Sequence, residues 1–147
     1  MTASGRIRVV QVLLTLTALE FFGPAIRDTG ASHLLNSEWV GHARVHLMWL
    51  LGFMVSSGVA NLYFIWRKRT PKLGDFHISF LWQGCNLLGF WIAVVLVKGY
   101  GGAIVDPRYH TAFFGVDENV FGFSILTTVY IVAFVYMKIR VAPLPRN

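Results

Sequence analysis

The stretch VHLMWLLGFMVSSGVANLYFIW, residues 45–66, contains no Asp, Glu, Lys or Arg. An α-helix rises about 1.5 Å per residue, so a run of this length matches the ~30 Å hydrocarbon core of a bilayer. Three further apolar runs cover residues 7–26, 78–97 and 120–137. The sequence therefore predicts an all-α, polytopic integral membrane protein, in which four transmembrane helices form an antiparallel bundle.

The overall composition agrees with this prediction. Hydrophobic residues make up 55% of the chain and charged residues only 14%, whereas soluble domains average about 25% charged residues. Neither a Pro-rich or Ser-rich linker nor an internal repeat divides the sequence, so residues 1–147 are expected to form one domain. The single cysteine excludes an intrachain disulfide framework, a zinc ribbon and a CxxC redox site.

The positive charge predicts an orientation in the membrane. The net charge is +6, but the basic residues flank the apolar runs and form no aromatic-interleaved stripe, so no nucleic-acid partner is expected. Four basic residues lie in the loops at residues 27–44 and 98–119. By the positive-inside rule the other nine place both termini in the cytoplasm, in the inner membrane or an endomembrane. These nine are Arg6, Arg8, Arg67, Lys68, Arg69, Lys72, Lys138, Arg140 and Arg146.

Glu20 is an ionisable residue inside the first apolar run. Such a residue is costly in a membrane and normally faces the bundle interior with a partner. Pro24 removes the donor that would bond the Glu20 carbonyl, so the helix is expected to kink or end there. Arg27 returns to nearly the same helix face, which makes a structural Glu20–Arg27 salt bridge one interpretation.

The second apolar run begins with a pair of histidines. His42 and His46 are four residues apart, so their side chains project from one helix face. Such a pair can bind a metal or share a proton. If His46 faces Glu20, the two groups form an acid–base pair near the outer surface.

The preceding loop adds Asp28 and His33, which extends the candidate site. Glu20, His46, His42 and Asp28 are the catalytic candidates. His33, His42 and His46 with one carboxylate are a candidate site for a divalent metal. In the alternative interpretation the histidines are interfacial polar residues, and no cofactor is required.

Candidates for substrate binding follow from the second and third runs. Aromatic residues there can form the walls of an apolar site, as can Phe90 and Trp91, although such residues often only pack. Gln83 and Asn86 share one helix face and are also candidates for interhelical hydrogen bonds. The full set is Trp49, Phe53, Ser57, Asn61, Gln83 and Asn86.

Two features concern packing and access. Gly52, Ser56 and Ala60 form a small-xxx-small pattern, which is expected to let a neighbouring helix approach closely. The loop at residues 98–119 is long enough to cover a cavity as a lid.

The segment His33-x-x-Asn36-x-x-Trp39-x-x-His42-Ala-Arg44-x-His46 resembles one found in a group of small four-span membrane proteins. That resemblance carries no established activity. The architecture also resembles the sterol-isomerase and sigma-2-receptor superfamily, with Asp28, Trp39 and His46 in comparable places. That family often has a carboxylate where this chain has His46. The second resemblance implies a sterol-like or isoprenoid ligand.

Three functions remain open from the sequence. The first is a membrane-embedded enzyme or binding protein for a small hydrophobic molecule, either sterol-like, isoprenoid or lipid. As an enzyme it would be a cofactor-independent isomerase, lyase or cyclase that uses Glu20 and His46 as acid and base. The second is a small accessory subunit of a larger membrane complex, and the third is a histidine-based metal-binding protein. The expected partners are the lipid bilayer, the ligand, and a second copy or a larger complex.

Overall fold

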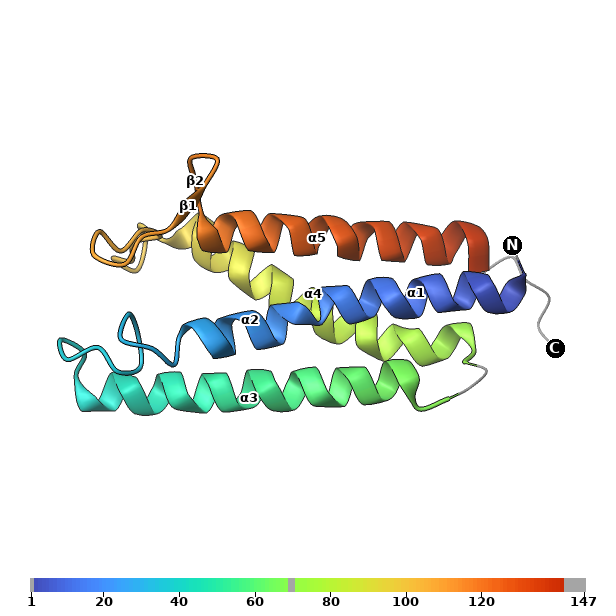
Figure 1. Ribbon diagram of the computed structural model, residues 1–147, viewed down its shortest axis with the longest axis horizontal. Coiled ribbons are helices and arrows are strands. Elements are labelled where there is room, and N and C mark those ends of the chain that lie inside the picture. Colours follow the sequence, from blue (N-terminus) through green and yellow to red (C-terminus); the bar gives the residue numbers. More distant parts are fainter. Residues whose placement is uncertain (1, 69–70, 142–147) are drawn as a thin grey trace.

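The computed structural model describes residues 2–68 and 71–141, so Arg69 and Arg146 of the charge argument lie outside the described residues. The chain is mainly helical, which confirms the all-α prediction, with one small hairpin in a loop (Figure 1). The elements are α1 (Ala3–Thr17), α2 (Leu19–Arg27), α3 (Gly41–Trp66), α4 (Leu73–Leu96), β1 (Ala112–Phe113), β2 (Val116–Asp117), α5 (Glu118–Tyr136) and a π-helical turn, Met137–Val141, that continues α5.

The helices lie along the long axis of the molecule, with α1 and α2 following one another in a single rod (Figure 1). Two long connections, residues 28–40 and 97–117, gather at one end, which we call the loop end. The start of α1, the end of α3 and the start of α4 lie at the opposite end. Within the described ranges, four helical segments are long and apolar enough to cross a membrane, namely Ala3–Arg27, Gly41–Trp66, Gly74–Leu96 and Glu118–Val141.

The first rod is interrupted at Ala18, between α1 and α2. The amide of Phe21 donates to the Ala18 carbonyl at 3.1 Å, an i→i−3 bond that tightens the chain at this point. The helix does not end at Pro24. Instead, α2 continues through this proline to Arg27. We attribute this to the neighbouring break, which already lets the backbone adjust to the proline ring.

A closely packed apolar cluster fills the bundle away from the loop end. It is formed by Val10, Leu14, Ile65, Phe76, Phe80, Ala133, Met137 and Val141. These residues come from every rod, so the cluster closes this half of the bundle.

Buried side-chain amides connect the helices next to that cluster. The Nε2 of Gln83 donates to the Leu14 carbonyl at 3.0 Å and to the Oδ1 of Asn61 at 2.9 Å. The Nε2 of Gln11 donates to the Ile65 carbonyl at 2.9 Å. The interhelical role expected for Gln83 is thus confirmed, and α1, α3 and α4 are held together by polar contacts.

The contact between α2 and α3 depends on Gly58. A Cβ atom at Gly58 would lie 2.5 Å from the Phe22 ring, whereas one at Gly52 would meet nothing within 4 Å. Gly52 and Ser56 are exposed. The expectation that Gly52, Ser56 and Ala60 form the contact face was therefore wrong, because α3 is rotated so that Gly58 faces its neighbour.

We predict that Gly58→Ala destabilises the protein by about 1–3 kcal/mol, because the added methyl group overpacks the Phe22 contact. Thermal unfolding in detergent, followed by circular dichroism, measures the effect. Gly52→Ala is the matched control on the same helix and should leave the midpoint unchanged. Equal midpoints for the two variants would contradict the packing described.

Candidate functional site

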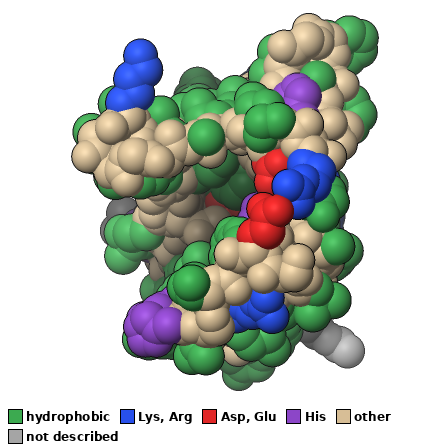
Figure 2. All heavy atoms as spheres, turned by 90° about the vertical axis from the view of Figure 1, so that its left-hand side faces the viewer, with side chains coloured by type: hydrophobic (Ala, Val, Ile, Leu, Met, Phe, Trp, Pro, Cys, Tyr) green, Lys and Arg blue, Asp and Glu red, His purple; other side chains and the backbone are tan. Residues whose placement is uncertain are grey.

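A cavity of about 620 Å³ opens among the helices toward the loop end. Viewed from that end, the molecule is hollowed at its centre, and charged side chains gather on one rim of the hollow (Figure 2). Residues from α2, α3, α4 and α5 line the cavity together with the loop after α4. Its wall includes Phe21, Phe53, Met54, Trp82, Asn86, Gly89, Phe90, Ala93, Tyr100, Ile104, Asn119 and Phe123.

The wall is mainly aromatic and aliphatic. Phe90 of α4 and Phe123 of α5 stack with their ring centroids 3.9 Å apart, which fixes one side. Phe53 and Trp82 contribute from α3 and α4. A cavity of this size, with an apolar wall and few polar groups, is typical of small-molecule binding sites.

Asp28 and His33 provide a carboxyl–imidazole pair at the cavity. The Nδ1 of His33 lies 3.5 Å from the Oδ1 of Asp28 and 3.0 Å from the Oγ of Ser32. The ring of Trp39 packs edge-on against His33 at 5.8 Å between centroids. Three neighbours thus fix the orientation of the imidazole.

The pKa of Asp28 lies above its ordinary value, because burial disfavours the charged carboxylate. The charges of His33 and Arg27 act in the opposite direction, while that of Glu118 adds to the rise. A histidine oriented by a carboxylate is a common general acid or base. The pair can therefore serve as a general acid or base toward a molecule in the cavity.

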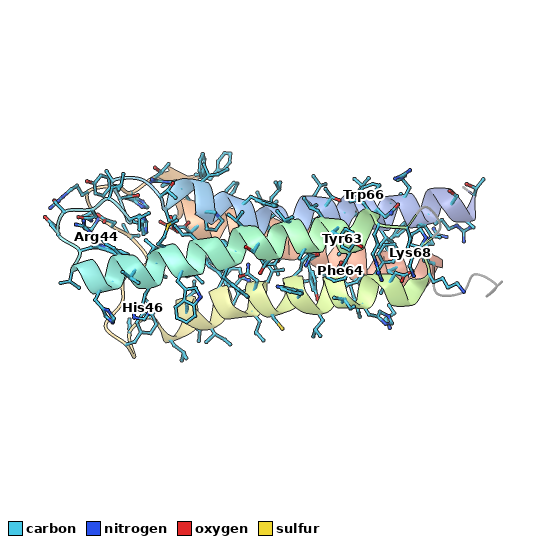
Figure 3. The ribbon with its side chains drawn as sticks, turned by 90° about the horizontal axis from the view of Figure 1, so that it is seen from below. Arg44, His46, Tyr63, Phe64, Trp66 and Lys68 are labelled. Atoms are coloured by element: carbon cyan, nitrogen blue, oxygen red, sulfur yellow. The ribbon has the colours of Figure 1, made fainter. Side chains whose placement is uncertain are left out.

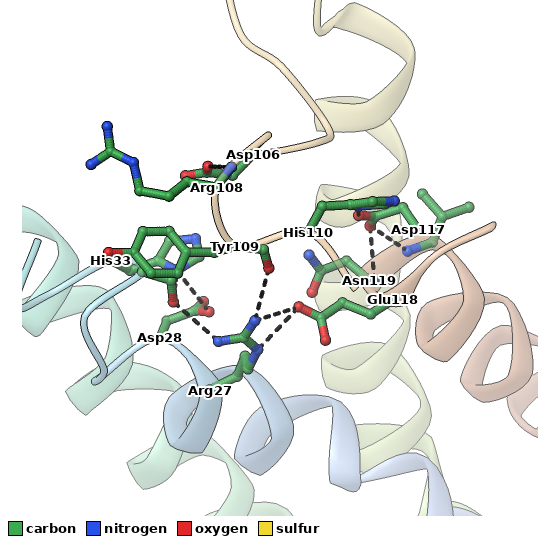
Figure 4. Close-up of polar contacts among 12 residues, drawn as sticks. Arg27, Asp28, His33, Asp106, Arg108, Tyr109, His110, Asp117, Glu118 and Asn119 are labelled. Carbon is green, nitrogen blue, oxygen red and sulfur yellow. Dashed lines mark hydrogen bonds and ion pairs between the residues drawn. The ribbon is translucent and has the colours of Figure 1, made fainter. Parts of the chain in front are cut away.

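Arg27 holds the loop end together. Its guanidinium lies 2.8 Å from the Oε1 of Glu118 at the start of α5, and donates to the Ser32 Oγ at 3.1 Å and to the Tyr109 carbonyl at 3.3 Å (Figure 4). The expectation that Arg27 pairs with Glu20 was therefore wrong. Since Arg27 ends α2, its side chain reaches the loops, whereas Glu20 is enclosed between helices.

A second, more polar cavity of about 500 Å³ lies beside the first and shares His33, Ala103, Ile104 and Asn119 with it. Two further ion pairs occur among its residues. The Arg108 guanidinium lies 2.9 Å from Glu38, and the His110 imidazole lies 3.4 Å from Asp117. The loop at residues 98–119 lines both cavities with Ala103 and Ile104, and its role as a lid stays a prediction.

Glu20 is fully buried, and neither carboxyl oxygen has a hydrogen-bond partner among the described residues. The side chain of Asn86 lies near this carboxyl group but forms no hydrogen bond with it. Phe21 and Pro24 of the same helix line the cavity, as does Asn86 itself. Glu20 therefore lies behind the cavity wall.

His42 and His46 lie on the exposed surface of α3, with their Nε2 atoms 3.0 Å apart. In Figure 3 Arg44 and His46 point to different sides of this helix. The structure does not bring His46 to Glu20, because its ring is turned outward and contacts His42 instead. The two histidines are also not joined by His33, and the described part of the chain holds no cluster of three metal-binding side chains.

The predicted substrate-binding residues divide into three groups. Phe53 and Asn86 line the cavity, whereas Trp49 is 72% exposed. Ser57, Asn61 and Gln83 are buried between helices and are not part of the wall.

The sequence analysis named Asn86 and Phe90 but missed other wall residues on α4, such as Trp82, Gly89 and Ala93. Trp82, Asn86, Gly89, Phe90 and Ala93 recur at spacings of three and four residues, which places them on one helix face. This spacing is the sequence signal that could have identified the face of α4 that lines the cavity. An all-round apolar helix hides such a face, because its lipid-facing side looks the same in sequence.

Comparisons with known proteins identify no relative. No protein-family model matches the chain, and neither a curated protein nor a solved structure shows detectable similarity to it. Functional inference therefore rests on the site itself.

We predict that Arg27→Gln lowers stability by about 1 kcal/mol, since it removes a partly buried charged hydrogen-bond network. Arg108→Gln removes an ion pair whose side chains are 61% and 63% exposed, and it should lower the unfolding midpoint less than Arg27→Gln does. Thermal unfolding in detergent distinguishes the two. A larger loss for Arg108→Gln would overturn the assignment of Arg27 as the residue that joins α2 to α5.

A pH dependence follows from Asp28. Burial raises the pKa of Asp28 in the folded state. The contribution of Asp28 to stability therefore falls as pH rises from its unfolded pKa of about 3.9 through its folded pKa. Asp28→Asn should match the wild type below this window and be more stable at neutral pH. Unfolding midpoints of the wild type and of Asp28→Asn, measured across this pH range, test the sign of the stability difference. A neutral-pH loss of stability in the variant would refute it.

Proposed function

We propose that the four long apolar segments cross a membrane as an antiparallel bundle, with the loop end outside and both termini in the cytoplasm. The buried share of the apolar window is only 22% in the α4 segment and 17% in the α5 segment. Most of this apolar surface therefore faces outward, which suits lipid. The distribution of basic residues supports the orientation.

The protein binds a small hydrophobic molecule, such as a sterol-like, isoprenoid or other lipid compound, in the cavity at the loop end. The observation that carries this proposal is the 620 Å³ cavity, with its aromatic wall and its single carboxyl–imidazole pair. The architectural resemblance to the sterol-isomerase superfamily agrees with it at two positions. Asp28 lines the cavity and Trp39 supports His33.

The chemistry that the site supports is proton transfer without a cofactor. With Nδ1 of His33 turned to Asp28 and Ser32, its Nε2 is the atom left to exchange a proton with the bound molecule. Isomerisation, hydration and cyclisation all require such a step. Glu20, behind the wall, is proposed as the second ionisable group near the cavity, whereas His46 takes no part.

We predict that Gly89→Phe fills the cavity and lowers ligand binding at least about tenfold, by the loss of ~1.4 kcal/mol or more. A Cβ at Gly89 meets nothing within 4 Å, so the variant is expected to fold. Binding is measured with a fluorescent sterol and a fluorescent fatty-acyl lipid, using protein in nanodiscs. Gly52→Phe on the outer side of α3 is the matched control.

The same assay separates binding from chemistry. His33→Asn should retain the bound probe and lose any turnover of lipids that co-purify with the protein, as followed by mass spectrometry. If Gly89→Phe and Gly52→Phe bind both probes as tightly as the wild type, the cavity is not the binding site.

A second candidate function is that of a small accessory subunit in a larger membrane complex. The outward apolar faces of α4 and α5 favour it, since partner helices can cover them as well as lipid can. Purification in a mild detergent discriminates the two. Stoichiometric recovery with one larger complex supports the subunit, and recovery of a monomer or dimer with bound lipid supports the binding protein.

A further inference from the structure

The exposed histidine pair on α3 is separate from the cavity. His42 and His46 lie on successive turns at the start of the helix, and both side chains are exposed. Their rings meet edge-on, with centroids 4.5 Å apart and the two Nε2 atoms 3.0 Å apart. The spacing of four residues is the one by which helical histidines share a metal ion.

The separation of the two nitrogen atoms selects a coordination geometry. Two imidazole nitrogens at ~2.1 Å from one ion subtend roughly 90° when they are 3.0 Å apart. That angle belongs to adjacent positions of a square-planar or tetragonal ion. A tetrahedral ion would require the nitrogens to move apart to about 3.4 Å. The arrangement therefore suits Cu²⁺ and Ni²⁺ better than Zn²⁺.

The surroundings of the pair are compatible with a cation. Arg44, between the two histidines in sequence, points to another side of α3 and donates to the Asn36 carbonyl, so its charge is turned away (Figure 3). Trp49 stacks beside His46, with centroids 6.3 Å apart. Because both rings are exposed, water can supply the remaining ligands.

We propose that His42 and His46 form a two-histidine surface site for a divalent transition-metal ion, with Cu²⁺ bound most tightly and Ni²⁺ next. Copper also forms the strongest complexes of the first-row divalent ions. The site is independent of the cavity and of the function proposed for it. It replaces the three-histidine site expected from the sequence, since His33 is engaged with Asp28 and Ser32.

The test uses the full-length protein in detergent, titrated with Cu²⁺, Ni²⁺ and Zn²⁺ in turn. Saturable quenching of tryptophan fluorescence by one Cu²⁺ per chain is expected, and Trp49→Phe should remove most of it. Electron paramagnetic resonance of the copper complex should show two equivalent imidazole nitrogens. His42→Ala and His46→Ala should each weaken binding by at least ~10-fold, since even losing an outer-shell partner costs that much.

Two matched variants control for nonspecific binding. His77→Ala and His110→Ala remove other histidines and should leave the copper affinity unchanged. Wild-type affinity in the His42→Ala/His46→Ala double variant would overturn the proposal, as would a spectrum with a single nitrogen ligand. Zn²⁺ binding tighter than Cu²⁺ would overturn the assigned geometry. In the first two of these cases the contact is only a hydrogen bond between two imidazoles.

Discussion

The hydrogen bonds of Gln83 set the register of three helices, and the rest of the bundle depends on that register. One amide group joins the Leu14 carbonyl of α1 to Asn61 of α3 from its position on α4. In the membrane proposed for this bundle, helices gain little from hydrophobic burial against one another, so polar contacts and close packing decide how they meet. On the side of Gln83 away from the loop end, the helices pack around the apolar cluster. On the side toward the loop end, the helices surround the cavity.

That division explains the layout of the candidate site. The closed half keeps the helices in place, while the open half leaves an apolar volume whose wall is mainly aromatic and aliphatic. Arg27 then ties α2 to α5 and to the covering loop, which brings Asp28 and His33 to the cavity. The polar chemistry is thus held by loop residues on a rigid helical frame, as in many binding proteins.

The sequence predicted the helices well because apolar runs of membrane-spanning length are a strong local signal. It also singled out Glu20, Asp28 and His33 as unusual residues. Their partners were harder to predict, because they depend on tertiary structure. Arg27 pairs with Glu118, which is 91 residues away, instead of with nearby Glu20. The rotation of α3 turns Gly58 inward and His46 outward, and an all-round apolar helix carries no pattern that fixes this rotation.

The central claim is that the cavity at the loop end holds a small hydrophobic molecule. An experimental structure in lipid nanodiscs, prepared without added ligand, tests it most directly. The account predicts elongated non-protein density inside the cavity, against Trp82, Phe90 and Phe123, with a polar end near His33. Closure of the volume by these side chains, or density for ordered water alone, would contradict it.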